Sequence, residues 1–346
     1  MPFNQIFAAL TITTALGLGA LALRPDHALA VPVATPVRIT ATPLPFDRDD
    51  PAVDRLGALK FMGAIQLRST DPLFGGISAL RFGGAAAGGA RLLAVSDTGN
   101  WLALETIETA GRLTGVQKAV LVPIRQADGT AAGTKVQGDA EALEWNPLTG
   151  DATIVYEQDH RMAHFTGIDA AHLATLTATP ARTEHLTAMT GWPPNGGGEA
   201  IAILQNGTRI VISERSEHPD GSHAALITRS GITSEIGVMG LADYSPTDAA
   251  ALDATHVLIL HRRFDLMGQG AAISITDLAP ALGPNPPAML PTHILAQWQP
   301  PMTVDNMEGL AIRREGERIF LYVVSDDNLS SLQRTLLMKF ELTPQP

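Results

Sequence analysis

An internal repeat constrains the fold of this chain more than any other feature. Five segments share a short core of an acid, a small residue and an apolar residue, although a serine replaces the acid in the first segment. The cores begin at Ser78, Glu141, Glu199, Asp248 and Glu308, at intervals of 63, 58, 49 and 60 residues. Each core is followed by an apolar strand that ends in polar residues. A strand-rich unit that recurs about every 50 residues is typical of β-propeller blades, which hold four strands each.

The rest of the pattern also favours an all-β fold. Short apolar runs alternate with turn residues such as Asn206-Gly207, the strongest short-range hairpin signal. The repeat shows five blades, and a sixth can be built from residues 59–67 paired with residues 336–342. Such pairing would remove the open edges of a linear array. We therefore expect a six-bladed β-propeller closed by its terminal strands; a pair of β-sandwiches would not explain the repeated phase of the acids.

The repeated acids indicate a cation site. The first strand of each propeller blade lines the central channel, so the acids that begin the repeat cores converge there. Carboxylates that share a dry channel must be protonated or neutralised by a cation. Oxygen ligands of this kind suit Ca²⁺ better than zinc. The predicted Ca²⁺ ligands are Asp139, Glu141, Glu199, Asp305, Asn306 and Glu308. In the alternative interpretation, each acid is structural and binds backbone N–H groups or an arginine.

The polar residues at the strand ends suggest an anionic substrate. Arginine forks match phosphate or carboxylate oxygens. A cation near them would polarise an ester and activate water. The predicted substrate-binding residues are Arg161, Arg215, Arg263 and Arg334, and His160 or Glu157 would handle protons. Alternatively, these arginines pair with acids that join adjacent blades.

Composition excludes several classes of protein. The chain has 346 residues and no cysteine, which excludes disulfides, cysteine-ligated zinc, iron–sulfur clusters and a cysteine nucleophile. Its formal net charge of −11 argues against general nucleic-acid binding, because phosphate backbones need a basic face.

The N-terminus is typical of a targeting segment. Residues 6–23 are apolar and uncharged, and Ala28-Leu29-Ala30 fits a signal-peptidase site. We predict a signal peptide over residues 1–30, although MPFNQ has no basic residue and the apolar run could instead stay as a membrane anchor. Residues 31–55 form a predicted extended lead-in, and residues 56–346 form the propeller domain. We expect a monomer that is periplasmic or secreted, with no other membrane contact.

Ten stretches of the sequence together carry a resemblance to a known family. They are Phe74–Leu80, Val95–Gly99, Gly138–Leu143, Glu157–Arg161, Asn195–Ala200, Ser213–Arg215, Leu260–Phe264, Asp305–Leu310, Ser325–Asn328 and Gln333–Leu337. Through them, most of residues 59–342 resemble the phytase-like family described as having esterase-like activity of phytase, an exported bacterial group. The resemblance implies a propeller-type domain, export and a hydrolase. His261 stands where the family often has Glu.

Two functions follow from these patterns. The first is a Ca²⁺-dependent hydrolase of a small phosphate or carboxylic ester, with the acids holding the metal and the arginines binding the anion. The second is a non-catalytic periplasmic propeller that binds a ligand or an envelope partner, with purely structural acids.

Overall fold

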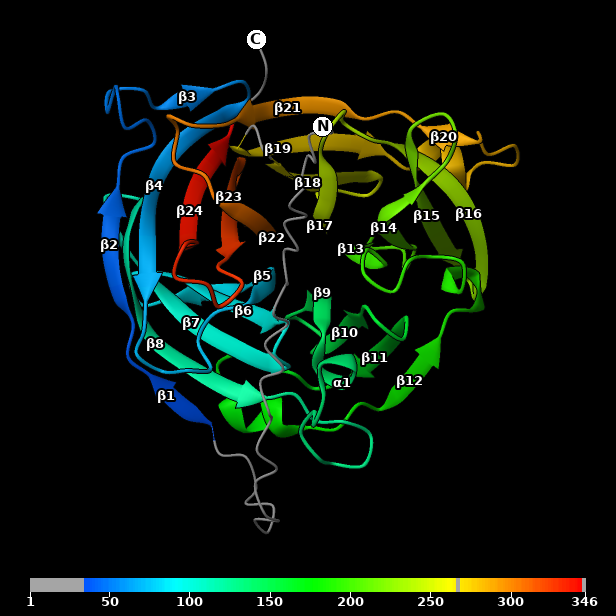
Figure 1. The fold of residues 1–346 in the computed structure, drawn as a ribbon, viewed down its shortest axis with the longest axis horizontal. Coiled ribbons are helices and arrows are strands. Elements are labelled where there is room, and N and C mark those ends of the chain that lie inside the picture. Colours follow the sequence, from blue (N-terminus) through cyan, green and yellow to red (C-terminus); the bar gives the residue numbers. More distant parts are fainter. Residues whose placement is uncertain (1–33, 266–267, 344–346) are drawn as a thin grey trace, which may run out of the picture. The chain divides into compact units, whose positions relative to one another are not determined.

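The strands form five separate sheets placed around a central axis (Figure 1). The computed structural model describes residues 34–265 and 268–343, so the predicted signal peptide lies outside the described residues. Helical structure in the described part is limited to four short segments: α1 (Lys135–Gly138) and the 3₁₀ turns η1 (Leu173–Thr177), η2 (Thr187–Met189) and η3 (Ala279–Leu282). The all-β propeller prediction is confirmed.

The first three blades are contiguous in the sequence, apart from one added outer strand each on blades 1 and 3. Blade 1 holds β5 (Ile77–Ala86), β6 (Gly89–Ser96), β7 (Asn100–Thr109) and β8 (Arg112–Pro123), with β1 (Thr35–Val37) outside β8. Blade 2 holds β9 (Ala140–Asn146), β10 (Asp151–Tyr156), β11 (Arg161–Phe165) and β12 (Arg182–His185). Blade 3 holds β13 (Gly198–Ile203), β14 (Arg209–Glu217), β15 (Ser222–Arg229), β16 (Ile232–Met239) and β20 (Met289–Leu290).

The last two blades show how the ring closes. Blade 4 holds β17 (Ser245–Ala251), β18 (His256–Asp265), β19 (Gly268–Asp277) and β21 (His293–Trp298). Blade 5 takes three strands from the C-terminal region and three from the N-terminal region: β22 (Asn306–Glu315), β23 (Arg318–Asp326) and β24 (Thr335–Leu342), then β4 (Leu59–Arg68), β2 (Thr40–Leu44) and β3 (Arg55–Leu56).

The predicted number of six blades is wrong, because the propeller has five. The predicted pairing of the N- and C-terminal strands exists: β4 lies antiparallel to β24, with Thr335 opposite Leu67 and Leu342 opposite Leu59. However, β4 does not begin a sixth blade. It completes blade 5, whose C-terminal part supplies only three strands. This closure leaves neither β4 nor β24 as an unpaired edge.

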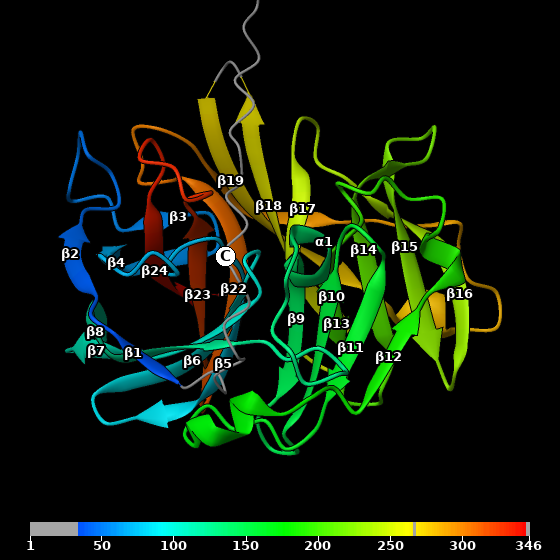
Figure 2. The ribbon, with the colours of Figure 1, turned by 60° about the horizontal axis from the view of Figure 1, so that its bottom comes forward.

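The inner strands β5, β9, β13, β17 and β22 surround the axis (Figure 1, Figure 2). Buried apolar side chains fill the five gaps between adjacent blades. Leu143 and Trp101 contribute to the core between blades 1 and 2, for example, and Leu310 and Leu258 to the core between blades 4 and 5. Because both faces of each sheet are covered in this way, most inner and second strands read as largely apolar runs, with exceptions such as Arg81 and Asp248 that lie within β5 and β17.

Each inner strand carries a β-bulge near its start. The unpaired residues are Ser78, Glu141, Glu199, Thr247 and Glu308. A bulge bends its strand and redirects a side chain. Four of these residues begin the sequence repeat, but in blade 4 the bulge falls on Thr247 rather than on Asp248. Asp248 therefore does not occupy the ring position that the repeat predicts for it.

Arg81 crosses the axis further along β5. Its guanidinium donates to the carboxylate of Asp248 at 2.8 and 3.0 Å and to Glu144 at 3.2 Å. It also donates to carbonyl oxygens of β5, β13, β17 and β22, namely those of Leu80, Ile201, Ala249 and Leu310. Although burial disfavours its charge, Asp248 and Glu144 raise the pKa of Arg81. One buried cation thus contacts all five inner strands.

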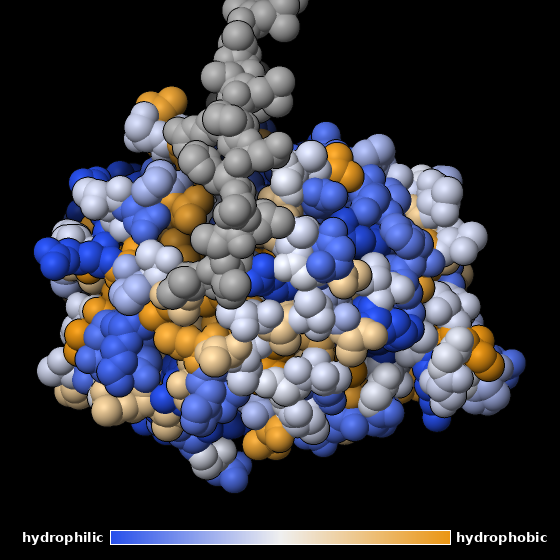
Figure 3. Space-filling model, turned by 90° about the horizontal axis from the view of Figure 1, so that it is seen from below, coloured by the Kyte–Doolittle hydropathy of each residue, from blue (hydrophilic) through white to orange (hydrophobic). Residues whose placement is uncertain are grey.

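Among residues 34–265 and 268–343, no helix combines the length and apolar character needed to cross a bilayer. On the side of the molecule that faces the bottom of Figure 1, hydrophilic and hydrophobic residues are interspersed (Figure 3).

Candidate functional site

Two repeated positions supply side chains to one end of the channel, where the inner strands begin, although Ser78 and Thr247 instead donate to the backbone carbonyls of Gly76 and Met307. The first is the bulged residue of the inner strand. The second is the residue after the last buried pair on the next strand, which gives Asp97, Glu157, Glu214, Arg262 and Asp326. Backbone bonds fix three of these second positions: the N–H groups of Asp97, Glu157 and Glu214 donate to the carbonyls of Gly76, Asp139 and Gly197. The fivefold repeat therefore produces a double ring of side chains.

These rings enclose a cavity of about 250 Å³. Seven carboxylates and three cationic side chains contribute to its wall, so its acids outnumber its bases. Blades 1, 2, 3 and 5 supply the acids, and blade 4 supplies an arginine in their place. The lining residues are Asp97, Lys135, Glu141, Glu157, Asn195, Glu199, Glu214, Arg215, Arg262, Asn306, Glu308, Asp326 and Asn328.

The acids of blades 2 and 3 lie closest together. Oxygen atoms of Asp139, Glu141 and Glu157 lie within 4.8 Å of one another, and so do oxygen atoms of Glu157, Glu199 and Glu214. Glu157 belongs to both groups, and it also accepts a short hydrogen bond from the Gly196 N–H. Carboxylates at this spacing repel one another unless a proton or a cation intervenes.

The pKa values of these acids reflect that repulsion. Burial raises the pKa of Glu141 well above its ordinary range, and Asp139 and Glu157 raise it further. Burial likewise raises the pKa of Glu199, with added repulsion from Glu141 and Glu214. In the metal-free protein the cavity therefore holds protons that ordinary carboxyl groups would have lost at neutral pH.

Arg262 neutralises the opposite side of the cavity. Its guanidinium donates to Glu214 at 2.7 Å and to the Asn306 side chain at 2.9 Å, and its Nε lies 3.1 Å from Glu308. Even with this partner, burial raises the pKa of Glu308 to about 8. Burial also raises the pKa of Asp326 to about 7. Of the cavity acids in blades 2 and 3, only Glu214 is paired with an arginine. The others are therefore available to a cation.

The mouth of the cavity carries the opposite charge. The side chains of Lys135 and Arg215 are 62% and 58% exposed, whereas Glu141, Glu199 and Glu308 are buried or partly buried behind them. Lys135 binds Asp139 and lies 3.8 Å from Asp97, and Arg215 lies 3.0 Å from Glu214. An exposed cationic rim over an acidic interior can attract an anion to a bound cation.

The predicted Ca²⁺ ligands are divided by the structure. Glu141, Glu199, Asn306 and Glu308 line the cavity. Asp139 is fully buried behind Glu141, where it binds Lys135 and Gln158.

Asp305 lies outside the cavity lining. Its carboxylate is 3.0 Å from Arg334 and also accepts from Gln269 at 3.1 Å. This ion pair matches the structural alternative, in which an acid joins neighbouring strands.

The predicted anion-binding arginines are mostly elsewhere. Only Arg215 lines the cavity. Arg161 is buried over the ring of Tyr156 and donates to the carbonyls of Val136 and Gln137, which ties α1 to blade 2. Arg263 donates to Gln299 at 3.0 Å, and Arg334 binds Asp305.

The two predicted proton carriers also separate. Glu157 lines the cavity, whereas His160 does not. The Nε2 of His160 lies 3.1 Å from the Trp192 carbonyl, and His160 occupies the turn after β10 with a φ of 50°.

Several cavity residues were missed by the sequence analysis as individual candidates: Asp97, Lys135, Glu214, Arg262, Asp326 and Asn328. The polar strand ends of the sequence repeat contained Asp97, Glu214, Arg262, Asp326 and Asn328, but alternation along a strand could not decide which neighbour faces the axis. Asp97, Glu214, Arg262 and Asp326 share one sequence position. Each directly follows a buried residue near the end of the second strand of its blade, and this position recurs in all five blades.

The residues present fit a hard cation. Ca²⁺ takes six to eight oxygen ligands at flexible geometry, and the cavity offers carboxylate and amide oxygens without a thiol or an imidazole. In addition, Asp97 Oδ1 is buried with no hydrogen-bond partner. Buried polar atoms are otherwise almost always paired, so this oxygen can accept a cation.

Comparisons with known proteins identify a family but no close relative. The family model "Phytase-like: Esterase-like activity of phytase" matches residues 72–329. No curated protein matches the chain.

Solved structures that match this chain include the catalytic domain of a Coprinopsis cinerea GH62 α-L-arabinofuranosidase, at 11% identity and TM-score 0.48. That match covers 87% of this chain and 100% of that one. The Malassezia sympodialis allergen Mala s 1 matches at 12% identity and TM-score 0.40, covering 83% of this chain and 91% of that one.

Proposed function

Because the chain belongs to the phytase-like family over residues 72–329, we propose that it is a Ca²⁺-dependent hydrolase of small anionic phosphate or carboxylic esters. The observation that carries this proposal is the axial cavity, in which seven carboxylates lie behind a rim of exposed Lys135 and Arg215. We further propose that the protein is a monomer exported to the periplasm or the medium.

The cation would be held on the side of blades 2 and 3. Glu141, Glu157, Glu199 and Glu214 form the acid groups there, and Glu157 joins the two groups. Bound Ca²⁺ would polarise the phosphoryl or acyl oxygen and favour attack by water. Arg262 keeps Glu214 and Glu308 in place through its donated bonds and its charge.

The residues of the rim and of blade 5 would serve the substrate. Lys135 and Arg215 bind the anionic group as it enters, because their side chains project from the mouth. Glu308 and Asp326, with pKa values of about 8 and about 7, hold a proton near neutral pH and can deliver it to the leaving oxygen. His160 has no part in this arrangement, and Glu157 becomes a cation ligand.

The experiment is an assay of the purified chain against 4-nitrophenyl phosphate, phytate and 4-nitrophenyl acetate, with Ca²⁺ and with EGTA. We expect turnover of at least one ester that requires Ca²⁺. Glu199→Gln should lower it at least tenfold, whereas Glu317→Gln, in an exposed turn of blade 5, should leave it unchanged. Background hydrolysis of all three esters in Ca²⁺ would overturn the proposal.

A second candidate function has its own supporting observation. Among the described residues, no serine, threonine or histidine lines the cavity, so its acidic groups are all carboxylates. A propeller that binds a cation or a cation–anion pair without turnover needs nothing more. Tight Ca²⁺ binding by the wild type, measured by calorimetry, together with background hydrolysis would favour this function.

A further inference from the structure

A pocket of about 460 Å³ adjoins the mouth of the axial cavity. Its wall comes from the β6–β7 turn, from α1 with the loop that precedes it, and from the β23–β24 loop. Asp97 and Lys135 line both this side pocket and the cavity, so the two spaces meet at these side chains. The remaining residues that line the side pocket are Thr98, Ala132, Gly133, Thr134, Gly138 and Leu329.

The charges of the side pocket are confined to its junction with the cavity. Of the described residues that line it, Asp97 and Lys135 alone are charged. The hydroxyl of Thr98 already bonds Ser96 at 2.8 Å and accepts from the Asn100 side chain at 3.1 Å. Away from the junction, the side pocket therefore offers mainly uncharged surface to a ligand.

Leu329 is held in a strained conformation at the edge of this pocket. Its φ is 50° and that of Asn328 is 48°, in the left-handed region where a bulky side chain is an outlier. The Leu329 N–H donates to Asp327 at 3.1 Å, and a Cβ at Gly75 would lie only 2.7 Å from Leu329 Cδ2. Backbone strain persists only where the surrounding structure imposes it, and it is common at ligand sites.

The strained turn divides its two residues between the two spaces. Asn328 lines the axial cavity, and Leu329 lines the side pocket. Leu329 is nevertheless 54% exposed, so a ligand in the side pocket can still cover apolar surface there. Covering that surface would contribute to binding through the hydrophobic effect.

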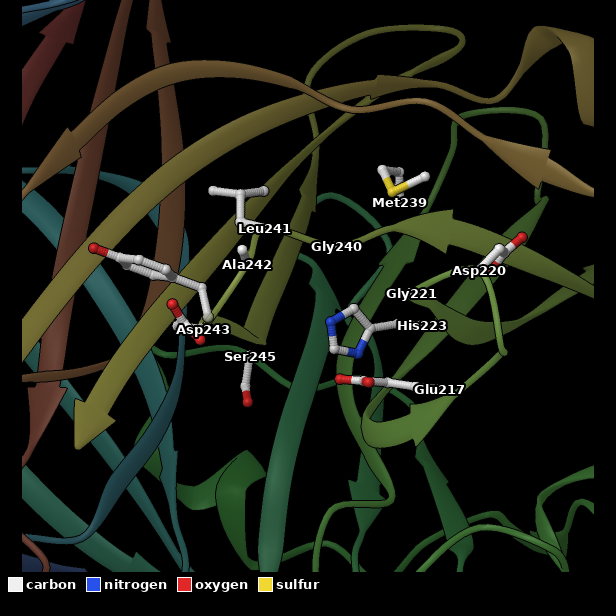
Figure 4. Close-up of a pocket in the computed structure, with 11 residues that line it drawn as sticks. Glu217, Asp220, Gly221, His223, Met239, Gly240, Leu241, Ala242, Asp243 and Ser245 are labelled. Atoms are coloured by element: carbon white, nitrogen blue, oxygen red, sulfur yellow. The ribbon is translucent and has the colours of Figure 1, made fainter. Parts of the chain in front are cut away.

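Another pocket of the same volume, between the β14–β15 hairpin and the loop that joins β16 to β17, lacks this arrangement (Figure 4). Glu217, Asp220 and Asp243 line it, and all three are exposed. Of the described residues, neither a lysine nor an arginine lines it. An anionic ester would be repelled there. Of these two pockets, only the side pocket joins a cationic side chain to an uncharged wall.

We propose that the side pocket binds the uncharged organic group of the ester, so that the substrate is a phosphate monoester of an alcohol with an apolar ring or short chain. This inference rests on the proposed function. The phosphoryl group would bind Lys135 at the junction, because the ammonium has three N–H donors and gives one to Asp139. The organic group would lie against Leu329 and Ala132.

The same arrangement disfavours two other kinds of ester. A neutral carboxylic ester such as 4-nitrophenyl acetate brings no anionic group to Lys135. Phytate would place further phosphates against an uncharged wall, with Asp97 beside them. We therefore expect 4-nitrophenyl phosphate to be the best substrate of the three esters.

The test compares two phosphonates, whose C–P bond the proposed reaction does not cleave, by calorimetry of the full chain in Ca²⁺. We expect benzylphosphonate to bind at least tenfold more tightly than methylphosphonate, because only its ring reaches the side pocket. Leu329→Asn should reduce that preference to threefold or less and leave methylphosphonate within twofold of the wild type. Asparagine tolerates the left-handed conformation, so the loop should keep its course.

Two further variants make the test specific. Leu329→Gly, which also accepts a positive φ, should lose the preference as Leu329→Asn does. Leu332→Asn should keep it, because Leu332 is 91% exposed in the same loop and does not line the side pocket. Equal binding of the two phosphonates, absence of binding, a preference that survives both Leu329 variants, or an equal loss in Leu332→Asn would overturn the inference.

Ca²⁺-dependent turnover of 4-nitrophenyl phosphate separates this inference from the proposed function. Turnover by a wild type that binds the two phosphonates equally would leave the hydrolase intact and remove only the role of the side pocket. A tenfold preference that depends on Leu329, without turnover of any ester, would remove the hydrolase and retain the side pocket as a binding site.

Discussion

Two carboxylate-rich sites lie on the same axis and differ in how their charge is matched. At Arg81, one guanidinium binds two carboxylates and four carbonyl oxygens, and every inner strand contributes. In the axial cavity, seven carboxylates face three cationic side chains, two of which are largely exposed at the rim. Both sites come from the same repeated strands.

The difference shows which buried charge is structural. Around Arg81 all three guanidinium nitrogens donate to buried acceptors, and the second carboxylate is accommodated because burial raises the pKa of Glu144 to about 7. In the cavity the acids of blades 2 and 3 are satisfied only by protons or by an added cation. A position in the channel therefore does not by itself mark a residue as functional. The carboxylates that lack a cationic partner identify the functional part of the channel.

The largest expected effect on stability comes from removing the charge of Arg81. Arg81→Met leaves Asp248 and Glu144 buried without their cation, which should lower the free energy of unfolding by about 3–5 kcal/mol. Urea unfolding followed by circular dichroism measures this loss. Arg91→Met, which removes a partly exposed pair with Glu105 on the same blade, should cost less than about 1 kcal/mol. Equal losses in the two variants would contradict the comparison.

In the axial cavity, removing a charge should change the stability in the opposite direction. Because Glu199 is repelled by its neighbours, Glu199→Gln should raise the melting temperature in EGTA. In the wild type, Ca²⁺ at a hundred times its dissociation constant should add about 2.7 kcal/mol. That increment should disappear in Glu199→Gln and persist in Glu317→Gln. A drop in the EGTA melting temperature of Glu199→Gln would show that the carboxylate is structural.

The pH dependence should separate the two sites further. Folding raises the pKa of Glu308 to about 8, so its contribution to stability is complete below about pH 4.5 and is lost as the pH rises through 8. Asp326, at about 7, acts in the same direction. Melting temperatures from pH 5 to 8.5 in EGTA should therefore fall.

Ca²⁺ provides the control for this pH dependence. Burial also raises the pKa of Glu144 to about 7 and of Asp248 to about 6, so part of the fall belongs to the Arg81 site and should remain in Ca²⁺. The part that Ca²⁺ removes should shrink in Glu308→Gln. If Ca²⁺ leaves the pH profile unchanged, the cavity does not bind it.

The smallest effect on stability should come from the rim. Arg215→Met removes an exposed guanidinium from buried Glu214, which keeps its bond to Arg262, so the free energy of unfolding should change by less than about 1 kcal/mol. Binding of inorganic phosphate in the presence of Ca²⁺, measured by calorimetry, should nevertheless weaken several-fold. Arg182→Met, which removes another exposed pair on blade 2, should change neither quantity appreciably. Unchanged phosphate binding in Arg215→Met would remove the rim from the proposed function.

Much of this fold could be predicted, because a repeat reports structure directly. The phase of the acids correctly placed Glu141, Glu199 and Glu308 on inner strands near one end of the channel. The number of blades could not be read in this way. The repeat marks where each inner strand begins, but it does not say which blade an N-terminal strand completes.

The misplacement of Asp248 has a physical cause. Side chains alternate along a strand, so a shift of one residue reverses the face that a side chain occupies. Thr247 takes the bulge in blade 4, and Asp248 turns toward Arg81 instead. Arg262 was likewise hidden among Arg263 and His261, because only the register of β17 and β18 shows which of the three faces the axis.

The closure of blade 5 has a consequence for how the protein is made. β4 and β24 come from opposite ends of the propeller sequence, yet they are neighbours in one sheet. The ring cannot be completed until the ribosome has released β24, and contacts so distant in sequence form slowly. We therefore expect the newly made chain to remain an open crescent for a time, with the half-built acidic cavity accessible from the gap. The wall of the cavity would be completed last, at the moment the two ends meet.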